Sequence, residues 1–450
     1  MAFKRPDPPS PRTPAERFPL AARAMLTQGM PAPAATRDTA APRAMPRRTH
    51  RQNWPLYLFL VLLPLQNIQF GYIPNLGAGL NFLNVGFLAS FAGALVAGGH
   101  LARGASVNRW VFAYMAYTIV SMFISTTYVS ESANHFAIVK DHLIGFSVLF
   151  LVQMSVRDWT TARRVVIAMM LPLPYIAKVA WVQHLSVASW HYSDDLRIPA
   201  TFGLLGANEF AAFCVTVATV LFAFFLSARL SRIWKIALGI GIACMVLGVL
   251  YAYSRTAYVA LILGLVTVIL AWRGRWKMML PLLLAAATLP AVLPSSVIER
   301  FDSTSVEETD RDESTEMRFV YWNIAWENFK AHPLTGTGIH SFQHREINPY
   351  GKDTHNLYIR TLSEGGVIGA VLLLGVLLSI VLTARRELAL ARNGTLHYAL
   401  ALGIVGAWMG LVCGNLFGDR FTHYPVIAYF WAFTALMLKA RELPREENPQ

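Results

Sequence analysis

The chain contains 450 residues, of which 55% are hydrophobic and 14% are charged, and its mean hydropathy is +0.42. Because soluble domains carry about 25% charged residues, this composition excludes a soluble enzyme, a disordered protein and a coiled coil. The net charge of +13 suggests nucleic acid at first sight, but its distribution along the chain indicates membrane orientation instead, and no nucleic-acid partner is expected.

Residues 1–52 differ in composition from the rest of the chain. They are rich in Pro, Ala, Arg and Thr, have no apolar periodicity, and contain ten basic and three acidic residues. A segment of this kind cannot bury enough apolar surface to fold. We therefore predict a disordered basic tail at 1–52.

Apolar stretches of about 16–25 residues recur after this tail, and this is the length that crosses roughly 30 Å of hydrocarbon. The stretches are continuous rather than alternating, so they predict spanning helices and exclude spanning strands. We expect an all-α membrane protein with about twelve transmembrane helices, at 54–73, 76–98, 108–130, 135–155, 164–185, 203–227, 233–252, 256–272, 277–294, 367–383, 398–417 and 425–439.

The basic residues between these stretches are distributed unevenly. If the tail is cytoplasmic, the inside loops and the C-terminal end hold 17 Lys and Arg residues, and the short outside loops hold only Arg197, Arg255 and Arg420. The positive-inside rule therefore predicts that both termini are cytoplasmic. The expected organisation is a tail at 1–52, nine helices within 53–294, a large outside loop at 295–366, three helices within 367–440 and a short cytoplasmic tail at 441–450.

The outside loop at 295–366 carries seven basic and twelve acidic residues, and a connection of this length is usually functional or disordered. Two parts have helical patterns. Residues 314–331 place Phe319, Trp322, Trp326 and Phe329 on one face, with Asp312 or Ser314 as a start signal and Pro333 as a stop. Residues 354–364 form the second candidate, closed by Gly365-Gly366. We predict that both helices lie over the outer mouth of the bundle.

The three outside arginines attract attention because the positive-inside rule acts against them. Arg197 and Arg420 have acidic neighbours in sequence, so local pairing or contact with lipid headgroups explains each of them as well as a functional role does. Arg255 has no such neighbour and joins two apolar helices, where a charge usually faces a polar cavity. Arg318 lies on or beside the aromatic face of the 314–331 helix. Two interpretations remain open: a cation–π pair with Trp322, or an arginine held towards the mouth of the bundle as part of the site.

Histidines and other polar clusters are less specific signals. His355 lies in the outside loop, but a lone histidine is more often structural than catalytic. His340 and His344 have metal-like spacing, but neighbouring glycines argue against a helix there and no carboxylate completes a ligand set, so no metal site is expected. For Lys140-Asp141-His142, an internally paired charge group is favoured over a proton relay. The three cysteines lie in apolar stretches and form no disulfide framework.

Four local patterns follow one another along the chain: RIPATFGLLGANEFAAF from Arg197, the Ser254-Arg255 turn, HPLTGTG after the aromatic helix, and HNLYIRTLSEGGVIG from His355. The most specific is the spacing His-Asn-x₇-Glu-x-Gly at the end of the outside loop. With the twelve spans, these patterns resemble the O-antigen ligase / O-antigen polymerase superfamily of bacterial polysaccharide enzymes. The resemblance covers about 54–440.

This resemblance implies a multi-pass inverting glycosyltransferase of the GT-C type in the bacterial inner membrane, with a periplasmic active site and no metal or other cofactor. The donor would be a glycan on undecaprenyl diphosphate, and the acceptor a glycan, lipid A core or protein. Membrane lipids and polysaccharide assembly proteins are the other implied partners. The family's functional arginines and histidine fall on Arg197, Arg255, Arg318 and His355.

The residue types suit this chemistry. A diphosphate leaving group develops charge that arginine forks can stabilise, and a histidine with a near-neutral pKa can take the proton of the acceptor hydroxyl or orient that hydroxyl. We assign catalysis to His355, Arg255 and Arg197. The candidates for binding the diphosphate or the glycan are Arg318, Asn208, Asn356, Trp322 and Glu364. Glu364 is expected to pair with Arg360 at i,i+4, because it is too far along one helix to touch His355.

The acceptor stays open at this point. The residues do not separate a polymerase or ligase for O-antigen, capsule or exopolysaccharide from a protein O-oligosaccharyltransferase. A transporter or flippase for a lipid-linked glycan is the competing class. Transporters place polar groups at the bilayer midplane, often within two repeated halves, whereas polar residues here concentrate in the outside segments. A structural partner of a secretion machine has no positive sequence feature.

Overall fold

The computed structural model describes residues 52–67, 81–130, 135–187, 193–203, 205–292, 298, 313–421 and 423–444. The regular elements over these ranges are helices, and the only extended pairing among them is an isolated bridge between Ala228 and Gly394. The predicted basic tail at 1–52 lies outside the described residues except for Gln52. The all-helical fold class is confirmed.

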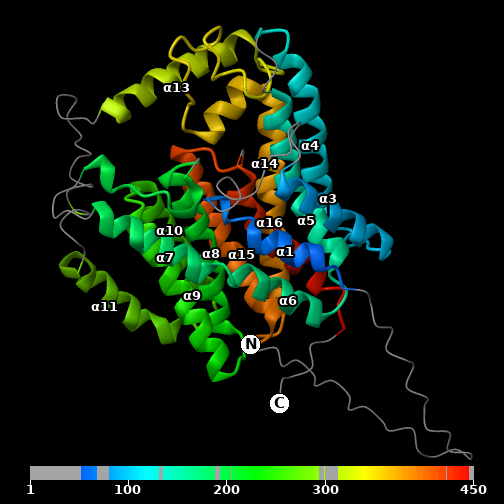
Figure 1. Ribbon diagram of the computed structural model, residues 1–450, viewed down its shortest axis with the longest axis vertical. Helices are drawn as coiled ribbons and strands as arrows, with labels where there is room; N and C mark the ends of the chain where they lie inside the picture. Colours follow the sequence, from blue (N-terminus) through cyan, green and yellow to red (C-terminus); the bar gives the residue numbers. More distant parts are fainter. Residues whose placement is uncertain are drawn as a thin grey trace, which may run out of the picture. The chain divides into compact units, whose positions relative to one another are not determined.

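Fourteen α-helices and three short 3₁₀ helices make up the described chain (Figure 1). They are α1 (Trp54–Leu62), α3 (Phe82–Val96), α4 (Ser106–Ser125), α5 (His135–Ser155), α6 (Trp159–Met170), α7 (Leu173–Val187), η2 (Asp194–Leu196), η3 (Ala200–Phe202), α8 (Ala207–Ser227), α9 (Arg232–Tyr251), α10 (Arg255–Ala271), α11 (Trp276–Val292), α13 (Glu313–Ala331), α14 (Leu357–Leu390), α15 (Leu396–Gly414), η5 (Asn415–Phe417) and α16 (Tyr424–Ala440).

Seven described segments are long and apolar enough to cross a membrane: Ser106–Ser125, Phe136–Ser155, Trp159–Val187, Ala207–Ser227, Arg232–Tyr251, Leu357–Leu390 and Leu396–Phe417. Three shorter apolar helices, α3, α10 and α16, accompany them. The protein is therefore a multi-pass membrane protein. Every stretch predicted to span contains a helix, but the count of twelve stays a prediction.

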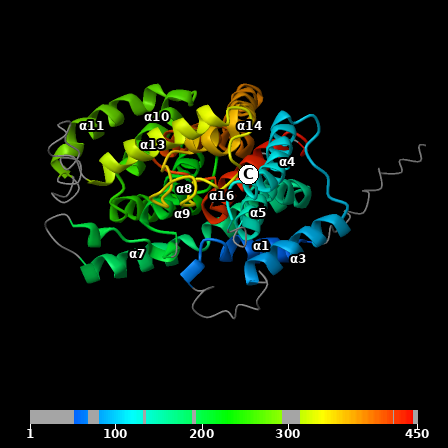
Figure 2. The ribbon, with the colours of Figure 1, turned by 90° about the horizontal axis from the view of Figure 1, so that it is seen from above.

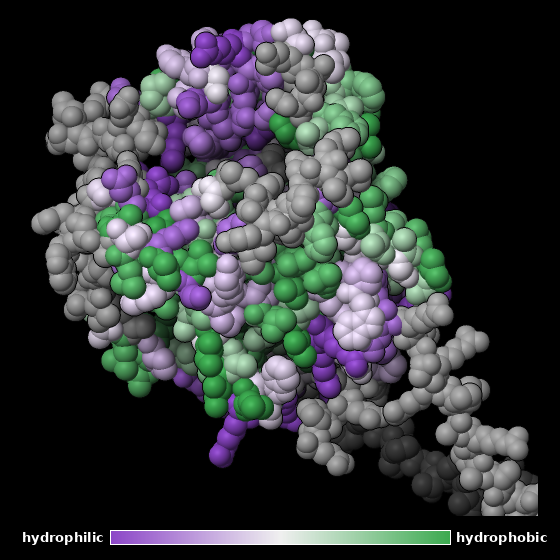
Figure 3. All heavy atoms as spheres, in the orientation of Figure 1, coloured by the Kyte–Doolittle hydropathy of each residue, from purple (hydrophilic) through white to green (hydrophobic). Residues whose placement is uncertain are grey.

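The centre of the bundle is formed by α16, which is buried along its whole length, and by the helices α5, α8 and α15 around it (Figures 1 and 2). Glycines allow helices to approach closely here: a Cβ on Gly406 of α15 would lie 2.4 Å from Cγ2 of Val268 on α10. Small residues at helix contacts are the usual packing device in membranes. On the face shown in Figure 3, hydrophobic residues predominate over the bundle, whereas hydrophilic residues gather over α13 and the loop after it.

The helix α13 and residues 332–356 form a cap over one end of the bundle, which we call the α13 face (Figure 1). The GTG sequence fixes this cap to the membrane helices. The amide of Gly338 donates to the Glu364 carbonyl at 2.8 Å, and a Cβ on Gly338 would lie 2.2 Å from the Ser125 amide nitrogen. With a φ of +92° as well, this position requires glycine.

The starts of the two expected helices of the cap differ from the structure, whereas the expected break at Gly365-Gly366 is present. The helix α13 starts at Glu313, so Ser314 lies inside it and does not cap it, and Asp312 lies outside the described residues. The second helix begins at Leu357, because Asn356 caps it. The expected break at Gly365-Gly366 is confirmed, because Gly366 has a non-helical φ of +59° and separates the first part of α14 from its long remainder by a kink.

The aromatic face predicted for α13 is not the face that packs. Tyr321 and Ala325 are buried and contact Phe342 of the following loop. Phe319 and Trp326 remain about half exposed, at 50% and 48%. The helical period agrees with the prediction, but the stripe that packs is the adjacent one, because Phe342 covers it.

Candidate functional site

Five segments at the end of the bundle that the α13 face covers carry most of the candidate residues. Two of them open the helices α8 and α10, one is the first half of α13, one is the 353–356 segment before α14, and one is the 415–421 loop between α15 and α16. Each polar group here sits at or next to a helix terminus, where backbone groups are left without intrahelical partners. Such termini can hold polar side chains at the edge of an apolar bundle.

Arg197 lies between η2 and η3 and is held by the start of α8. Its Nη2 donates to Oδ1 of Asn208 at 2.9 Å. Asn208 is the second residue of α8, after Gly206, whose φ of +102° turns the chain into the helix. This contact explains why arginine and asparagine occur eleven residues apart in one motif, and it joins two of the predicted site residues.

Arg420, in the loop between α15 and α16, is the second arginine that contacts the first turn of α8. It is only 4% exposed, and its Nη1 donates to Oε1 of Glu209 at 2.5 Å. It does not pair with its neighbour Asp419, as local pairing would have required. A small cavity of about 20 Å³ is lined by Asn208, Arg420 and Thr256, so the starts of α8 and α10 face the same space.

Arg255 is the first residue of α10, is half-buried, and directly precedes Thr256, which lines this cavity. The preceding Tyr253 has a φ of +45°, so the α9–α10 turn is strained. Among the described residues, the non-glycine residues with positive φ are Ala200, Tyr253, His340 and His355. Tyr253 precedes Arg255 by two residues and Ala200 follows Arg197 by three, while His340 and His355 lie in the α13 face. Strained backbone positions cluster at functional sites.

Charged residues from several of these segments affect the pKa of His355. Its side chain is open to solvent, but desolvation by the surrounding protein lowers its pKa below the ordinary value. Asp353 and Glu209 act to raise that pKa, and Arg318 and Arg420 act to lower it. The structure thus places His355, Arg318 and Arg420 near one another, and at neutral pH the imidazole is uncharged and able to accept a proton.

The remaining predicted residues support this arrangement. Trp322 donates its Nε1–H to the carbonyl of Thr354 at 2.8 Å, which ties α13 to the His355 segment. The side chain of Asn356 accepts from the amides of Tyr358 and Ile359 and so caps α14. Both contacts are made within the protein, so each residue orders the segment beside His355.

Glu364 is buried and faces inward. It accepts from Nε of Arg360 at 3.0 Å and from the amide of Phe342 at 3.2 Å. The i,i+4 pairing expected from the sequence is confirmed. Its binding role toward glycan or diphosphate stays a prediction.

Residues outside the predicted set also belong to the site. The position of Arg420 in an outside loop marks it in the sequence, although it is not among the predicted site residues, and Glu209 carries no signal beyond its position in the first turn of α8. Arg360 was noted only as a partner of Glu364, yet it contacts three segments. Glu209 and Arg420 are 211 residues apart in sequence, so only the fold brings them together.

The other polar clusters flagged in the sequence are Lys140-Asp141-His142 and the pair His340 and His344. Lys140 and Asp141 form an ion pair at 3.2 Å, and the His142 ring packs 4.8 Å from that of Phe146; this agrees with an internally paired group. The rings of His340 and His344 meet edge to face at 5.8 Å. Within the described ranges, no group of three or more His, Cys, Asp or Glu residues is arranged to hold a metal ion.

Comparison with known proteins identifies one domain. Residues 240–374 match the family model described as O-Antigen ligase. This range contains Arg255, Arg318 and His355 but not Arg197 or Arg420. A search of curated proteins found no match to the chain. The domain match confirms the resemblance to the O-antigen ligase/polymerase superfamily.

Proposed function

We propose that this multi-pass membrane protein, whose residues 240–374 match the O-antigen ligase family, is an inverting glycosyltransferase of surface polysaccharide assembly. It transfers a glycan from a polyprenyl-diphosphate carrier to an acceptor hydroxyl, as a polymerase or a ligase. We place it in the bacterial inner membrane with both termini cytoplasmic and the α13 face in the periplasm. A GT-C-type architecture with about twelve spans is part of the same proposal.

The observation that carries this proposal is the convergence of arginines with an uncharged histidine at one face. Arg197, Arg255 and Arg420 occupy segments that open or precede α8, α10 and α16, and Arg318 lies near His355. A lipid diphosphate carries about two or more negative charges beside a low-dielectric bilayer. Arginine forks match its oxygens and stabilise charge that grows as the bond breaks, so no metal is required.

The proposed reaction is a single displacement. The acceptor oxygen attacks the anomeric carbon from the face opposite the diphosphate, a new C–O bond forms, and the bond from the anomeric carbon to the diphosphate oxygen breaks. The leaving diphosphate keeps the electron pair and is held by the arginines. A ring nitrogen of His355 takes the hydroxyl proton. One displacement inverts the configuration at the anomeric carbon.

Deletion of the gene tests the proposal in cells. We expect a change in surface glycans that separates the two forms of the function on a gel. Single repeat units without long chains indicate a polymerase, whereas unmodified lipid A core with accumulated lipid-linked polymer indicates a ligase. Loss of protein-linked glycans alone would assign the enzyme to protein glycosylation. Glycans unchanged in length and attachment would contradict the proposal.

A further inference from the structure

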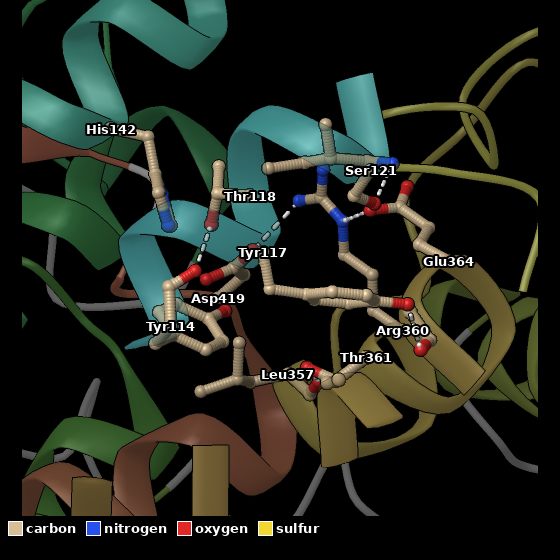
Figure 4. Close-up of a pocket in the computed structure, with 13 residues that line it drawn as sticks. Tyr114, Tyr117, Thr118, Ser121, His142, Leu357, Arg360, Thr361, Glu364 and Asp419 are labelled. Carbon is tan, nitrogen blue, oxygen red and sulfur yellow. Dashed lines mark hydrogen bonds and ion pairs between the residues drawn. The ribbon is translucent and has the colours of Figure 1, made fainter. Parts of the chain in front are cut away.

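A buried ion cluster lies behind the candidate site, around Arg360 in the first turn of α14 (Figure 4). Arg360 is 4% exposed. Its Nε donates to Oε2 of Glu364 at 3.0 Å and its Nη1 to Oδ2 of Asp419 at 2.7 Å. Oδ1 of Asp353 lies 3.7 Å from the same Nη1, and Nδ1 of His340 lies 3.4 Å from Nη2.

Two of these partners, Asp353 and Asp419, belong to the two segments that carry the chemistry. Asp353 precedes His355 by two residues, and Asp419 directly precedes Arg420. The backbones of the two segments also meet, because the amide of Leu357 donates to the carbonyl of Gly418 at 3.0 Å. The cluster therefore joins the chain just before His355 to the chain just before Arg420.

The Arg420 guanidinium folds back over Gly418, where a Cβ would lie 2.5 Å from Nη2 of Arg420. The orientation of the Arg420 side chain is thus set by the loop that contains Gly418 and Asp419, and Asp419 is held in place by Arg360. Oδ1 of Asp419 also accepts from the amide of Phe421 at 3.1 Å. A shift of Asp419 would move Arg420 with it.

Arginine is suited to this position because its planar fork presents donors in several fixed directions. Lysine carries the same charge as a single point and cannot reach Glu364, Asp419 and Asp353 together. The cavity of about 40 Å³ beside Arg360 is lined by Tyr114, Thr118 and His142 of the membrane helices. Arg360 thus faces the bundle interior, behind the segments that carry His355 and Arg420.

We propose that Arg360 is a positioning residue: it clamps the His355 segment and the Arg420 segment in the relative geometry that glycan transfer needs. This inference rests on the proposed function. Misplacement of reacting groups by about 1 Å costs up to roughly 10²-fold in rate, so a clamp of this kind acts on turnover more than on donor binding.

The clamp also has an electrostatic consequence. Burial acts to raise the pKa of Asp353, but the charges of Arg360 and His355 lower it below the ordinary value, so Asp353 is ionised at neutral pH. The charged groups that act on His355 are Asp353 from its own segment, Arg318 from α13, Glu209 from α8 and Arg420 from the 415–421 loop. Of these, Arg360 contacts Asp353 directly.

The test is kinetic, with Arg360→Lys in purified, full-length protein and a polyprenyl-diphosphate-linked glycan as donor. In the wild type, the uncharged imidazole is the active form, so kcat should fall as pH drops through a pKa below the usual value of about 6.5. In Arg360→Lys we expect kcat to fall by about 10- to 100-fold with the donor KM nearly unchanged. The acid limb should move to lower pH, because Asp353 is no longer held beside His355.

Arg386→Lys is the matched control, since Arg386 is exposed near the other end of α14; its kcat and pH profile should equal those of the wild type. Wild-type kcat with an unmoved acid limb in folded Arg360→Lys would overturn the inference. If that variant does not fold, Asp419→Asn removes one arm of the clamp, and wild-type turnover in it would overturn the inference equally. Absence of transfer by the wild type would instead refute the proposed function.

Discussion

Replacing His355 by alanine is expected to lower turnover by about 10²–10⁴-fold, the usual contribution of a general base. Donor binding should remain nearly intact, because the proton leaves the acceptor hydroxyl and not the diphosphate. The side chain of His355 is open to solvent, so its loss should not prevent insertion or folding. The measurement compares the turnover per folded molecule and the donor affinity of the detergent-purified variant with those of the wild type.

His344→Ala provides the matched control, because His344 lies in the same cap and its ring contacts that of His340. It should keep wild-type turnover, and it would lose activity if the two histidines held a catalytic metal. A His355→Ala protein with near wild-type turnover removes this residue from the mechanism. Reduced folded protein with unchanged activity per molecule would assign His355 a purely structural role.

Arg255→Lys is expected to lose about 10²–10³-fold in kcat, the range seen when one preorganised donor to a developing charge is removed. Donor binding should weaken as well, because the diphosphate is charged in the ground state. The substitution keeps the charge but replaces a bidentate fork by a point charge. Transfer kinetics and donor affinity measured together separate these two losses.

Arg232 supplies a control with the same local setting, since it is the first residue of α9 as Arg255 is of α10. Arg232 is exposed and lies at the opposite end of the bundle, so Arg232→Lys should leave kcat and donor affinity unchanged. Full activity in Arg255→Lys would show that charge alone suffices at residue 255 and that the fork has no role.

The helical fold was predictable because continuous apolar stretches leave few alternatives in a bilayer. Helix ends and packing faces were less so. The side chain of Asn356 caps α14, so this helix starts later than its pattern predicts. Phe342 packs on Tyr321 and Ala325, so this stripe of α13 is buried and the more aromatic stripe is not. Both outcomes depend on residues distant from the helix pattern or on a single capping side chain.

The candidate site was predictable in part for an electrostatic reason. Arginines in outside loops contradict the positive-inside rule, and this singled out Arg197, Arg255 and Arg420. Their partners could not be predicted, because Glu209 meets Arg420 across 211 residues and Asp419 meets Arg360 across 59. Charge patterns identify which residues need a partner, whereas the fold decides which partner each one has.

The most direct test of the central claim is glycan transfer by the purified protein in proteoliposomes. Polyprenyl-diphosphate-linked glycan and an acceptor are supplied, and mass spectrometry follows the product and the released polyprenyl diphosphate. We predict that the wild type forms a new glycosidic bond with inverted anomeric configuration and releases the diphosphate carrier, and that His355→Ala does so at least about 10²-fold more slowly. Movement of intact lipid-linked glycan between leaflets, equal in the two proteins and without any bond cleavage, would contradict the account and assign the protein to transport.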